Sequence, residues 1–384
     1  MKFVFASDSF KGTMSSREIH EILTASALEA FPDCKTQSVC IGDGGEGTVE
    51  ALSLTLKGTW HQVHVHNPLF KKIGTRYYAL SNKTAIMEMA TASGYSLIKL
   101  TPQSIRKANS YGTGEMMVHA IEQGVRKIIL GIGGSATNDG GIGALAAFGF
   151  RFLDKEGNEL LPIAENLSNI AFIDQSHRHP KLENVEIVVI SDVNSPLLGK
   201  NGATYVYGPQ KGADKTALEE LEEGMENFYA VCKKTFGQTR ANDFPGAGAA
   251  GGLGYALKVF LGVKLRPGIE YVLDLLKFDK LIEGADLIIT GEGKIDAQSA
   301  HGKVVAGVIA RARKQGIPVY AIVGKQGSGA EELLGMGLTK IIETAQYAKN
   351  PRLVLQQAKP LYKEAAQKVF SELRSNYQKS LTRM

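Results

Sequence analysis

The chain has 384 residues, of which 43% are hydrophobic, and a formal net charge of +5. This length suggests two or three domains with enough chain to bury a core without disulfides or structural metals. The small charge excess, with no long basic block, argues against a nucleic-acid partner. Glycine is the outlier, with 43 residues, about 11% against a usual 7%, but the chain has no collagen period.

The cysteines and the N-terminus predict a cellular compartment. Cys34, Cys40 and Cys232 are odd in number and lack the spacing of a zinc or redox motif, which indicates free thiols in a reducing environment. Asp8 interrupts the first apolar run, so a signal peptide is not expected, and no stretch approaches 18 apolar residues. The sequence therefore predicts a soluble, cytoplasmic protein with no membrane partner, and it carries no signature of an oligomeric state.

The first part of the chain predicts two strand–helix units. Residues 2–6 form an apolar strand, and residues 15–31 have helical spacing with Ser15 or Ser16 as the N-cap. Residues 38–41 are expected to form the second strand and residues 48–56 the second helix.

The middle of the chain has a different pattern. Residues 60–66 alternate with period two, and residues 72–79 and 84–90 are also strand-like, which predicts antiparallel or mixed pairing. Two further apolar runs, at residues 126–130 and 185–190, predict buried strands.

The C-terminal part returns to alternating strands and helices. Short apolar strands are expected at residues 285–290, 318–323 and 340–344, with a helix at residues 299–314 between the first two. Continuous apolar strands that alternate with helices predict a parallel sheet covered on both faces. The last helix, residues 360–383, has charged exposed positions and is expected to dock on the surface.

These elements predict an α/β protein of two α/β domains. The first is a doubly wound, Rossmann- or flavodoxin-like parallel sheet built from both chain ends, residues 1–82 and 284–384. The second is an inserted α/β domain with a mixed sheet, residues 83–283.

Three loops match a dinucleotide-binding pattern. Residues 42–47 and 246–251 follow GxGxxG, and residues 131–136 follow GxGxxA after a predicted strand, with Asp154 at the distance of a ribose-binding acid. A nicotinamide-dependent dehydrogenase is therefore one hypothesis. A second is that the glycines of any single loop only permit tight turns and close packing.

Acidic residues within the loops argue against a dinucleotide. Asp43 and Glu46 lie in the first loop, and Asp139 closely follows the second. Carboxylates repel a pyrophosphate unless a divalent cation lies between them, so Mg²⁺ with a nucleoside triphosphate fits these loops better than NAD. The four Gly-Lys pairs are not followed by Ser or Thr, so this is not a Walker A protein.

Acids also follow predicted strands. Asp8, Asp43, Asp192 and Glu292 each come at or soon after the end of a strand, beside Gly or Ser. Ligands of parallel sheets bind at the carboxyl ends of strands, so these acids are expected to meet in one cleft.

Together, six motifs resemble the type 1 glycerate kinase family, from one end of the chain to the other. They are Asp8-Ser-Phe-Lys-Gly12, Gly42-Asp-Gly-Gly-Glu-Gly-Thr48, Gly133-Gly-Ser-Ala-Thr-Asn-Asp-Gly-Gly141, Ser191-Asp-Val-Asn-Ser-Pro-Leu197, Gly248-Ala-Ala-Gly-Gly-Leu-Gly254 and Thr290-Gly-Glu-Gly-Lys-Ile-Asp296. The resemblance implies ATP-dependent phosphorylation of D-glycerate, with Mg²⁺, in a cleft between two α/β domains. The resemblance also implies the 2-hydroxyl as the acceptor, giving 2-phospho-D-glycerate and ADP, although no motif by itself distinguishes the two hydroxyls.

Applying phosphoryl-transfer chemistry to the motif positions assigns hypothetical roles. Asp192 accepts the hydroxyl proton or holds metal, and Lys11 and Lys294 supply positive charge. Asp43, a catalytic candidate, also belongs with the candidate Mg²⁺ ligands Asp139, Glu292 and Asp296. The candidate residues for binding substrate or phosphate are Ser9, Gly44, Gly45, Gly133, Gly134, Ser135, Thr137, Asn138, Gly251 and Gly252.

Two alternatives stay open at this stage. An NAD-dependent 2-hydroxy acid dehydrogenase would not need ATP, and a non-catalytic nucleotide-binding regulator would bind ATP without consuming it.

Overall fold

The computed structural model describes residues 1–10, 12–42, 44–300, 303–350 and 353–381. The chain forms two compact units, here called the terminal unit and the inserted unit. The terminal unit comprises Met1–Asp43, Glu50–Leu56 and Gly268–Met384, and the inserted unit comprises Gly44–Val49 and Lys57–Pro267.

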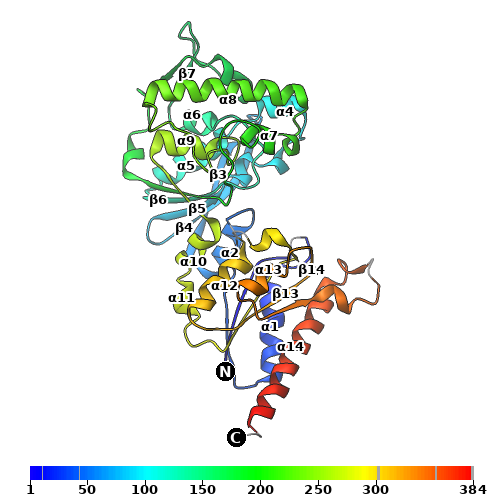
Figure 1. The fold of residues 1–384 in the computed structure, drawn as a ribbon. Helices are drawn as coiled ribbons and strands as arrows, with labels where there is room; N and C mark the ends of the chain where they lie inside the picture. The colour runs from blue at the N-terminus through cyan, green and yellow to red at the C-terminus, as the bar shows by residue number, and fades with distance from the viewer. Residues whose placement is uncertain (11, 43, 301–302, 351–352, 382–384) are drawn as a thin grey trace. The chain divides into compact units, whose positions relative to one another are not determined.

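A five-stranded parallel sheet forms the centre of the terminal unit (Figure 1). Its strands are β1 (Lys2–Ser7), β2 (Lys35–Ser38), β11 (Leu287–Gly291), β13 (Val319–Val323) and β15 (Lys340–Glu343), with the short pair β12 (Lys294–Ile295) and β14 (Lys325–Gln326) beyond it. The spatial order is β2-β1-β11-β13-β15. This is the 2-1-3-4-5 order of flavodoxin-like sheets, with its topological switch point between β1 and β11. The predicted parallel sheet from both chain ends is confirmed.

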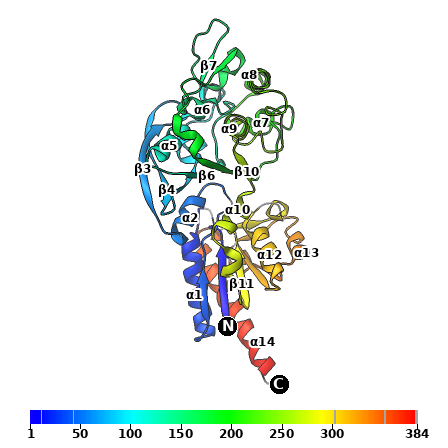
Figure 2. The same ribbon diagram turned by 90° about the vertical axis from the view of Figure 1, so that its left-hand side faces the viewer.

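Helices cover both faces of this sheet, because its central strands are apolar on both sides. Phe3 and Phe5 face one layer, and the alternate residues Val4 and Ala6 are also fully buried. In Figure 2, α1 and α12 lie on opposite sides of the strands. The helices of the unit are α1 (Ser16–Ala30), α10 (Gly268–Leu275), α11 (Phe278–Leu281), α12 (Val304–Lys314), α13 (Glu332–Met336) and α14 (Ala358–Leu381), with 3₁₀ turns at Ala297–Ala300 and Thr344–Tyr347. One further helix, α2 (Thr48–Thr55), spans the change between the two units.

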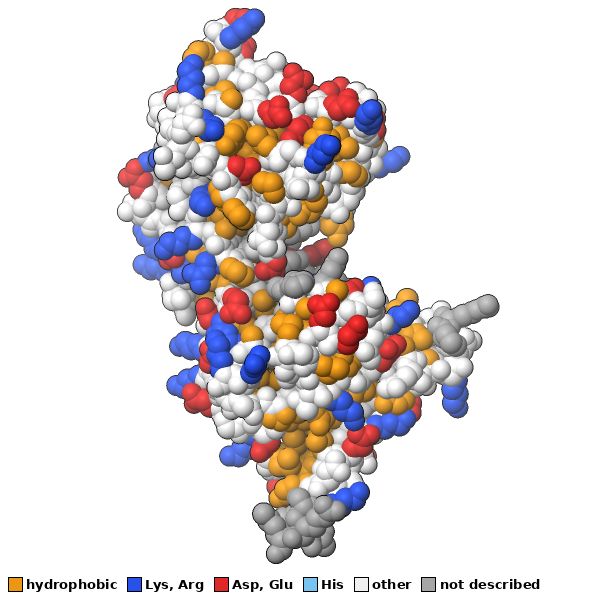
Figure 3. All heavy atoms as spheres, viewed as in Figure 1, with side chains coloured by type: hydrophobic (Ala, Val, Ile, Leu, Met, Phe, Trp, Pro, Cys, Tyr) orange, Lys and Arg blue, Asp and Glu red, His pale blue; other side chains and the backbone are white. Residues whose placement is uncertain are grey.

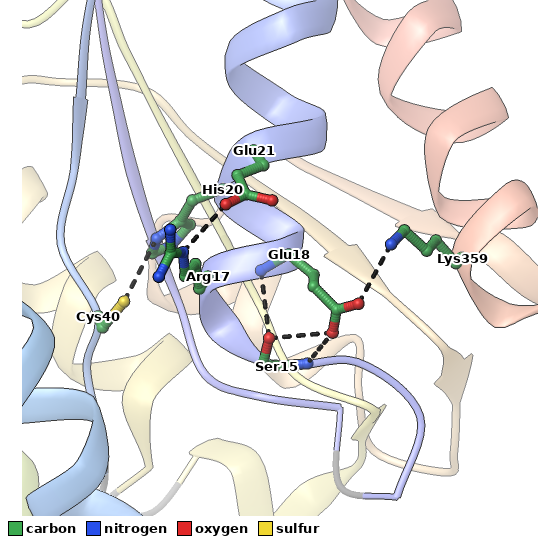
Figure 4. Close-up of polar contacts among 7 residues, drawn as sticks. All are labelled: Ser15, Arg17, Glu18, His20, Glu21, Cys40 and Lys359. Atoms are coloured by element: carbon green, nitrogen blue, oxygen red, sulfur yellow. Dashed lines mark hydrogen bonds and ion pairs between the residues drawn. The ribbon is translucent and has the colours of Figure 1, made fainter.

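The first helix begins at a capping box, as its sequence indicates. The Ser15 hydroxyl accepts a hydrogen bond from the Glu18 backbone N–H, and the Glu18 carboxylate accepts one from the Ser15 N–H (Figure 4). Lys359 of α14 lies 3.2 Å from the other Glu18 oxygen. These contacts hold the pKa of Glu18 to about 2, chiefly through the Ser15 backbone hydrogen bond.

The last helix packs more deeply than the surface docking predicted for residues 360–383. Tyr362 and Phe370 of α14 are fully buried. The Tyr362 ring contacts Phe10 edge to face, and the Phe370 ring contacts both Phe3 and Phe5 in the same geometry. The charged residues that suggested a surface helix occupy only its outer side. One face of α14 is therefore part of the core, beside α1 (Figure 1).

The edge strand also differs from its prediction. Residues 38–41 were expected to form it, but β2 covers Lys35–Ser38, and Val39, Cys40 and Ile41 are buried in the segment that follows. The Val39 N–H still donates to the Phe5 carbonyl oxygen of β1 at 2.9 Å, so only the rest of the apolar run marks burial rather than pairing. An edge strand can be polar when only one side of it carries a partner.

His20 is buried on the inner side of α1. The Ser7 N–H lies 3.3 Å from His20 Nε2, and Cys40 Sγ lies 3.7 Å from Nδ1 (Figure 4). Only 4% of the residue is exposed, and this burial lowers the pKa of His20 to about 4. The folded chain therefore keeps this imidazole neutral at a pH where the unfolded chain protonates it.

We expect His20 to destabilise the fold in acid. The unfolded chain binds the extra proton below pH 6.5, so stability is complete above that pH and falls, by up to about 3 kcal/mol, as the pH drops to 4. In denaturant unfolding as a function of pH, His20→Gln is expected to be less stable than the wild type at pH 7 but to lose less stability between pH 6.5 and 4. His64→Gln, a change at an exposed histidine, is the control and should keep the wild-type dependence. An unchanged acid slope in His20→Gln would contradict the assignment.

The inserted unit contains a six-stranded mixed sheet of order β10-β9-β6-β5-β4-β3. The strands are β3 (Gly58–His66), β4 (Lys72–Leu80), β5 (Thr84–Glu88), β6 (Lys127–Gly131), β9 (Glu186–Ile190) and β10 (Lys264–Arg266), with a separate hairpin of β7 (Arg151–Leu153) and β8 (Phe172–Asp174). Antiparallel pairing joins β3 to β4 and β4 to β5, and parallel pairing joins β5 to β6, β6 to β9 and β9 to β10. The predicted mixed sheet is confirmed.

Helices pack around this sheet and enclose a second core. They are α3 (Ala90–Ser93), α4 (Pro102–Lys107), α5 (Tyr111–Glu122), α6 (Ile142–Ala147), α7 (Ala203–Tyr207), α8 (Lys215–Phe236) and α9 (Leu253–Leu261), with 3₁₀ turns at Tyr95–Leu97, Ala164–Asn169, Pro180–Asn184 and Pro209–Lys211. The core includes a stack of aromatic rings in which Phe228, Phe260 and Phe152 meet at centroid distances near 6.3 Å.

Strand pairing decides where the inserted unit begins and ends. The sequence places the domain changes at residues 82/83 and 283/284, but β3 and β4 hydrogen-bond to β5 and so belong with the inserted sheet. At the other end, α10 and α11 belong with the terminal unit, where Arg311 of α12 forms ion pairs of 2.6–2.8 Å with Glu270, Asp274 and Asp279.

Among the described residues, no helix is both long enough and apolar enough to cross a lipid bilayer.

Hydrophobic side chains are exposed on part of the terminal unit. On the face drawn in Figure 3, they gather over the part where α1 and α14 lie. Leu28 and Tyr377 are exposed hydrophobic residues of these two helices.

Candidate functional site

The terminal unit has a cavity of about 730 Å³, here called the strand-end pocket, at the carboxyl ends of four neighbouring strands. It lies over the switch point between β1 and β11, where ligands of doubly wound sheets bind. Its lining consists of Asp8, Ser9, Phe10, Thr13, Glu292, Gly293, Lys294, Lys303, Gly324, Lys325, Thr344, Ala345, Val354, Leu355 and Ala358. Three residues of the sequence-based site hypothesis are thus together here: Ser9, Glu292 and Lys294.

Charges of both signs line the strand-end pocket. Lys303 Nζ lies 3.8 Å from Glu292 Oε2, and Lys294 Nζ lies 2.8 Å from Asp296 Oδ2, a candidate metal ligand just outside the lining. The Ser9 N–H donates to Asp8 Oδ1 at 2.6 Å. Lysines beside carboxylates at one strand edge suit a polyanion that brings a divalent cation.

Apolar side chains also line the strand-end pocket. They belong to Phe10, Ala345, Val354, Leu355 and Ala358, and Leu355 is 75% exposed. A pocket lined by both apolar and charged side chains can hold a flat ring and phosphates together.

In the inserted unit, residues of the three glycine-rich loops (44–47 of the first, 131–136 and 246–251) lie close together. A Cβ added to Gly131 would lie 2.7 Å from the Gly44 carbonyl oxygen, and one added to Gly133 would lie 3.3 Å from Gly45 Cα. The third loop contacts the segment that follows the second through a hydrogen bond of 2.9 Å from the Gly140 N–H to the Gly251 carbonyl oxygen. Close backbone approach explains why glycine occupies these positions.

A second cavity, here called the glycine-loop pocket, has about 410 Å³ and lies in the inserted unit beyond β6 and β9. It is lined by Tyr95, Ile132, Gly133, Gly134, Ser135, Val193, Tyr207, Gln210, Lys211 and Ala250. The predicted anion-binding residues Gly133, Gly134 and Ser135 are therefore brought together on a cavity wall.

Two glycines predicted to bind substrate have a packing role in the structure. A Cβ on Gly251 would lie 2.1 Å from the Thr137 carbonyl oxygen, and one on Gly252 would lie 2.8 Å from Gly140 Cα. Thr137 and Asn138 themselves are fully buried, and Asn138 Nδ2 donates to Thr204 Oγ1 at 3.1 Å. These four residues shape the loop behind the glycine-loop pocket.

Asp139 is arranged as a structural group. Its carboxylate is fully buried and accepts hydrogen bonds of 2.7–3.1 Å from the Ser110 N–H and hydroxyl and from the Gly141 and Gly143 N–H groups. Burial raises the pKa of Asp139, and these hydrogen bonds oppose the rise. These hydrogen bonds join the start of α5 to the start of α6, and the metal-binding role of Asp139 stays a prediction.

The remaining candidates are distributed as follows. Asp192 is exposed after β9, next to Val193, which lines the glycine-loop pocket. The Gly44 N–H donates to Thr48 Oγ1 at 3.0 Å. Lys11 and Asp43 lie outside the described residues. Of the acids expected to share one cleft, Asp8 and Glu292 line the strand-end pocket, whereas Asp192 follows a strand of the other sheet.

The sequence patterns did not identify two residues that contact the glycine loops or line the glycine-loop pocket, Glu88 and Lys211. Glu88 ends the buried strand β5, and its carboxylate accepts from the Gly47 N–H at 3.1 Å and the Val49 N–H at 2.7 Å, which holds the first glycine loop. The sequence feature that could have identified Glu88 is its position as the acidic last residue of an apolar strand. Lys211 is buried on the wall of the glycine-loop pocket, and its Pro-Gln-Lys-Gly context looks like a surface turn.

Comparisons with known proteins agree with the family resemblance that the sequence motifs indicate. A model of the glycerate kinase family matches residues 3–374. The glycerate kinase of Halalkalibacterium halodurans is 38% identical over 372 residues, which is 95% of this chain and 96% of that protein. The glycerate 2-kinase of Escherichia coli K12 is 42% identical over 325 residues, covering 84% of this chain and 85% of that one.

A solved structure is similar throughout. The crystal structure of a candidate glycerate kinase 2 from Salmonella typhimurium LT2 superposes with a TM-score of 0.86 at 36% identity, and the match covers 98% of this chain and 99% of that one. Of the three hypotheses from the sequence, these matches favour the kinase over the dehydrogenase and the non-catalytic regulator. The chain belongs to the glycerate kinase family, and it is a phosphotransferase that uses ATP and glycerate.

Proposed function

We propose that the chain transfers the γ-phosphoryl group of ATP to the 2-hydroxyl of D-glycerate, giving 2-phospho-D-glycerate and ADP. The family match over residues 3–374 carries the reaction class. The choice of the 2-hydroxyl is supported by the name of the Escherichia coli relative, a glycerate 2-kinase.

ATP is assigned to the strand-end pocket. Support comes from its place at the switch point of a flavodoxin-like sheet, from Lys294, Lys303 and Lys325 in its lining, and from its apolar lining residues. Phosphoryl transfer depends on positioning and on neutralising charge on the phosphate oxygens, and lysines supply that charge. Lys11, in the Asp8–Gly12 motif, is proposed for the same role from the sequence alone.

Mg²⁺ is proposed to accompany ATP, and the donor groups of the pocket fit it. Asp8 and Glu292 offer carboxylate oxygens within the lining, and Asp296 lies beside them through Lys294. Among the described residues, no group of three or more His, Cys, Asp or Glu could hold a metal by itself. Mg²⁺ commonly needs only one or two carboxylates, since substrate phosphates and water complete its shell. When bound, it would neutralise phosphate charge.

Asp192 is proposed as the group that accepts the hydroxyl proton, with metal binding as the alternative role. It follows β9 and adjoins Val193 on the wall of the glycine-loop pocket. A carboxylate that ends a strand and is open to solvent can meet a substrate hydroxyl without being covered by the protein itself.

A coupled assay of ADP release tests the reaction. We expect ADP to form only when D-glycerate and Mg²⁺ are both present. ADP released at the same rate without D-glycerate, or no ADP with it, would contradict the proposal.

The same assay can identify the hydroxyl. Enolase acts on 2-phosphoglycerate directly, so a phosphoenolpyruvate signal from enolase alone is expected. A signal that also requires a phosphoglycerate mutase would indicate the 3-hydroxyl. Proton NMR of the product provides an independent check.

A further inference from the structure

The wall of the glycine-loop pocket contains a buried lysine. Lys211 closes the 3₁₀ turn Pro209–Lys211, and only 4% of the residue is exposed. A buried ammonium is costly unless hydrogen bonds or a negative charge compensate it. Its surroundings therefore indicate what it binds.

The described residues use only one of the hydrogen-bond donors of this ammonium. Lys211 Nζ donates to the Thr137 carbonyl oxygen at 2.6 Å. In the described part of the chain this is its one hydrogen bond, and no carboxylate lies within 4.0 Å of it. An ammonium has three N–H donors, so two can serve a group in the pocket.

Backbone donors line the same pocket. In the ranges that the structure describes, the N–H groups of Gly133, Gly134 and Ser135 donate to no protein acceptor. Consecutive unpaired amides in a loop form a concavity that binds anions. The pocket thus joins a positive charge to a set of amide donors.

The protonation state suits this role. Burial lowers the pKa of Lys211 to about 8, and the negative charge of Asp139 opposes that change. At pH 7 most molecules therefore carry the ammonium. The carboxylate of Asp139 is already occupied by Ser110, Gly141 and Gly143, so it balances the charge at a distance without using the remaining donors.

Both cavities have room for the ligands proposed for them. The glycine-loop pocket has about 410 Å³, more than a three-carbon acid needs, and the larger strand-end pocket has about 730 Å³, which suits a nucleotide. Tyr207 and Gln210 in the lining add neutral hydrogen-bonding groups for hydroxyls.

We propose that Lys211 Nζ and the amides of Gly133, Gly134 and Ser135 bind the carboxylate of D-glycerate. The inference rests on the proposed function and names the subsite that selects an acid as the substrate.

Kinetics of Lys211→Met test the role of the ammonium. Loss of a charged hydrogen-bond donor is expected to raise KM for D-glycerate on the order of 10- to 100-fold, with KM for ATP unchanged. Lys215→Met is the matched control, since that side chain is 91% exposed in the same unit, and it should behave as the wild type. An increase in KM for ATP alone, or no change in either KM, overturns the inference.

A neutral substrate analogue isolates the carboxylate. D-glyceramide replaces the carboxylate by an uncharged amide of similar shape. We expect the wild type to prefer D-glycerate strongly and Lys211→Met to lose 10- to 100-fold of that preference. A wild type that uses both compounds equally well contradicts the proposal.

A measurement on the wild type covers the case in which Lys211→Met fails to fold. Titration with D-glycerate is expected to shift the amide NMR signals of Gly133, Gly134 and Ser135, whereas a non-hydrolysable ATP analogue should not. The reverse result assigns the pocket to phosphate and refutes the inference. If D-glycerate shifts these amides but wild-type enzyme releases no ADP, the proposed function fails while the carboxylate site stands.

Discussion

Replacing Asp192 by asparagine is expected to lower kcat by a factor on the order of 10² to 10⁴, the usual cost of removing a general base. Asparagine keeps the shape of the side chain but cannot accept the proton of the substrate hydroxyl. The side chain is exposed after β9, so its replacement should leave the fold intact. Steady-state kinetics with D-glycerate and ATP, at saturating Mg²⁺, measure the effect.

A matched control and the Mg²⁺ dependence separate the possible roles of Asp192. Glu223→Gln removes an exposed carboxylate from α8 of the same unit and should retain wild-type turnover. If Asp192 holds metal instead, higher Mg²⁺ concentrations should partly restore the activity of Asp192→Asn. Wild-type turnover by Asp192→Asn at all Mg²⁺ concentrations would remove this residue from the mechanism.

Gly251→Ala is expected to destabilise the chain by about 2–4 kcal/mol. The backbone at Gly251 has a φ of +64°, and an added Cβ would lie 2.1 Å from the Thr137 carbonyl oxygen and 2.6 Å from Asn138 Cα. Both neighbours are backbone atoms of a fully buried segment, so they cannot move aside cheaply. Because Lys211 donates to the same Thr137 oxygen, KM for D-glycerate should rise as well.

Gly262→Ala separates packing from backbone strain. Gly262 has a similar φ of +68°, but nothing lies within 4 Å of its added Cβ, so only the left-handed conformation is penalised, by about 1 kcal/mol. Denaturant unfolding of both variants measures the difference. Equal stabilities would contradict the packing role of Gly251. A stable Gly251→Ala with weakened ATP binding would instead support the phosphate-binding role suggested by the sequence.

The architecture of the terminal unit was largely predictable. Its strands are short apolar runs that alternate with helical segments, and that pattern requires a parallel sheet buried on both faces. The prediction placed the edge strand too late because it followed the apolar residues Val39 to Ile41, whereas β2 is polar. It also placed α14 on the surface, since the buried face formed by Tyr362 and Phe370 is hidden among charged residues.

The candidate site was predicted in part. Ser9, Glu292 and Lys294 line the strand-end pocket, and Gly133, Gly134 and Ser135 line the glycine-loop pocket. These residues stand at strand ends and in glycine loops, which sequence patterns mark directly. Their individual roles stay predictions. Lys211 was missed because its burial depends on contacts with Thr137, 74 positions away in the chain.

The glycine-rich loops show which features the sequence determines and which only the tertiary structure decides. Local patterns determined the position of each loop, because tight turns and strand ends depend on neighbouring residues. The reaction class came from the resemblance of six motifs to the glycerate kinase family. Only the tertiary structure separated glycines that form a cavity wall, such as Gly133, from glycines such as Gly251 that let two backbones touch. It also showed that the carboxylate of Asp139 is buried and accepts a hydrogen bond from the Ser110 N–H. Burial and contact arise from segments distant in sequence, and no local pattern encodes them.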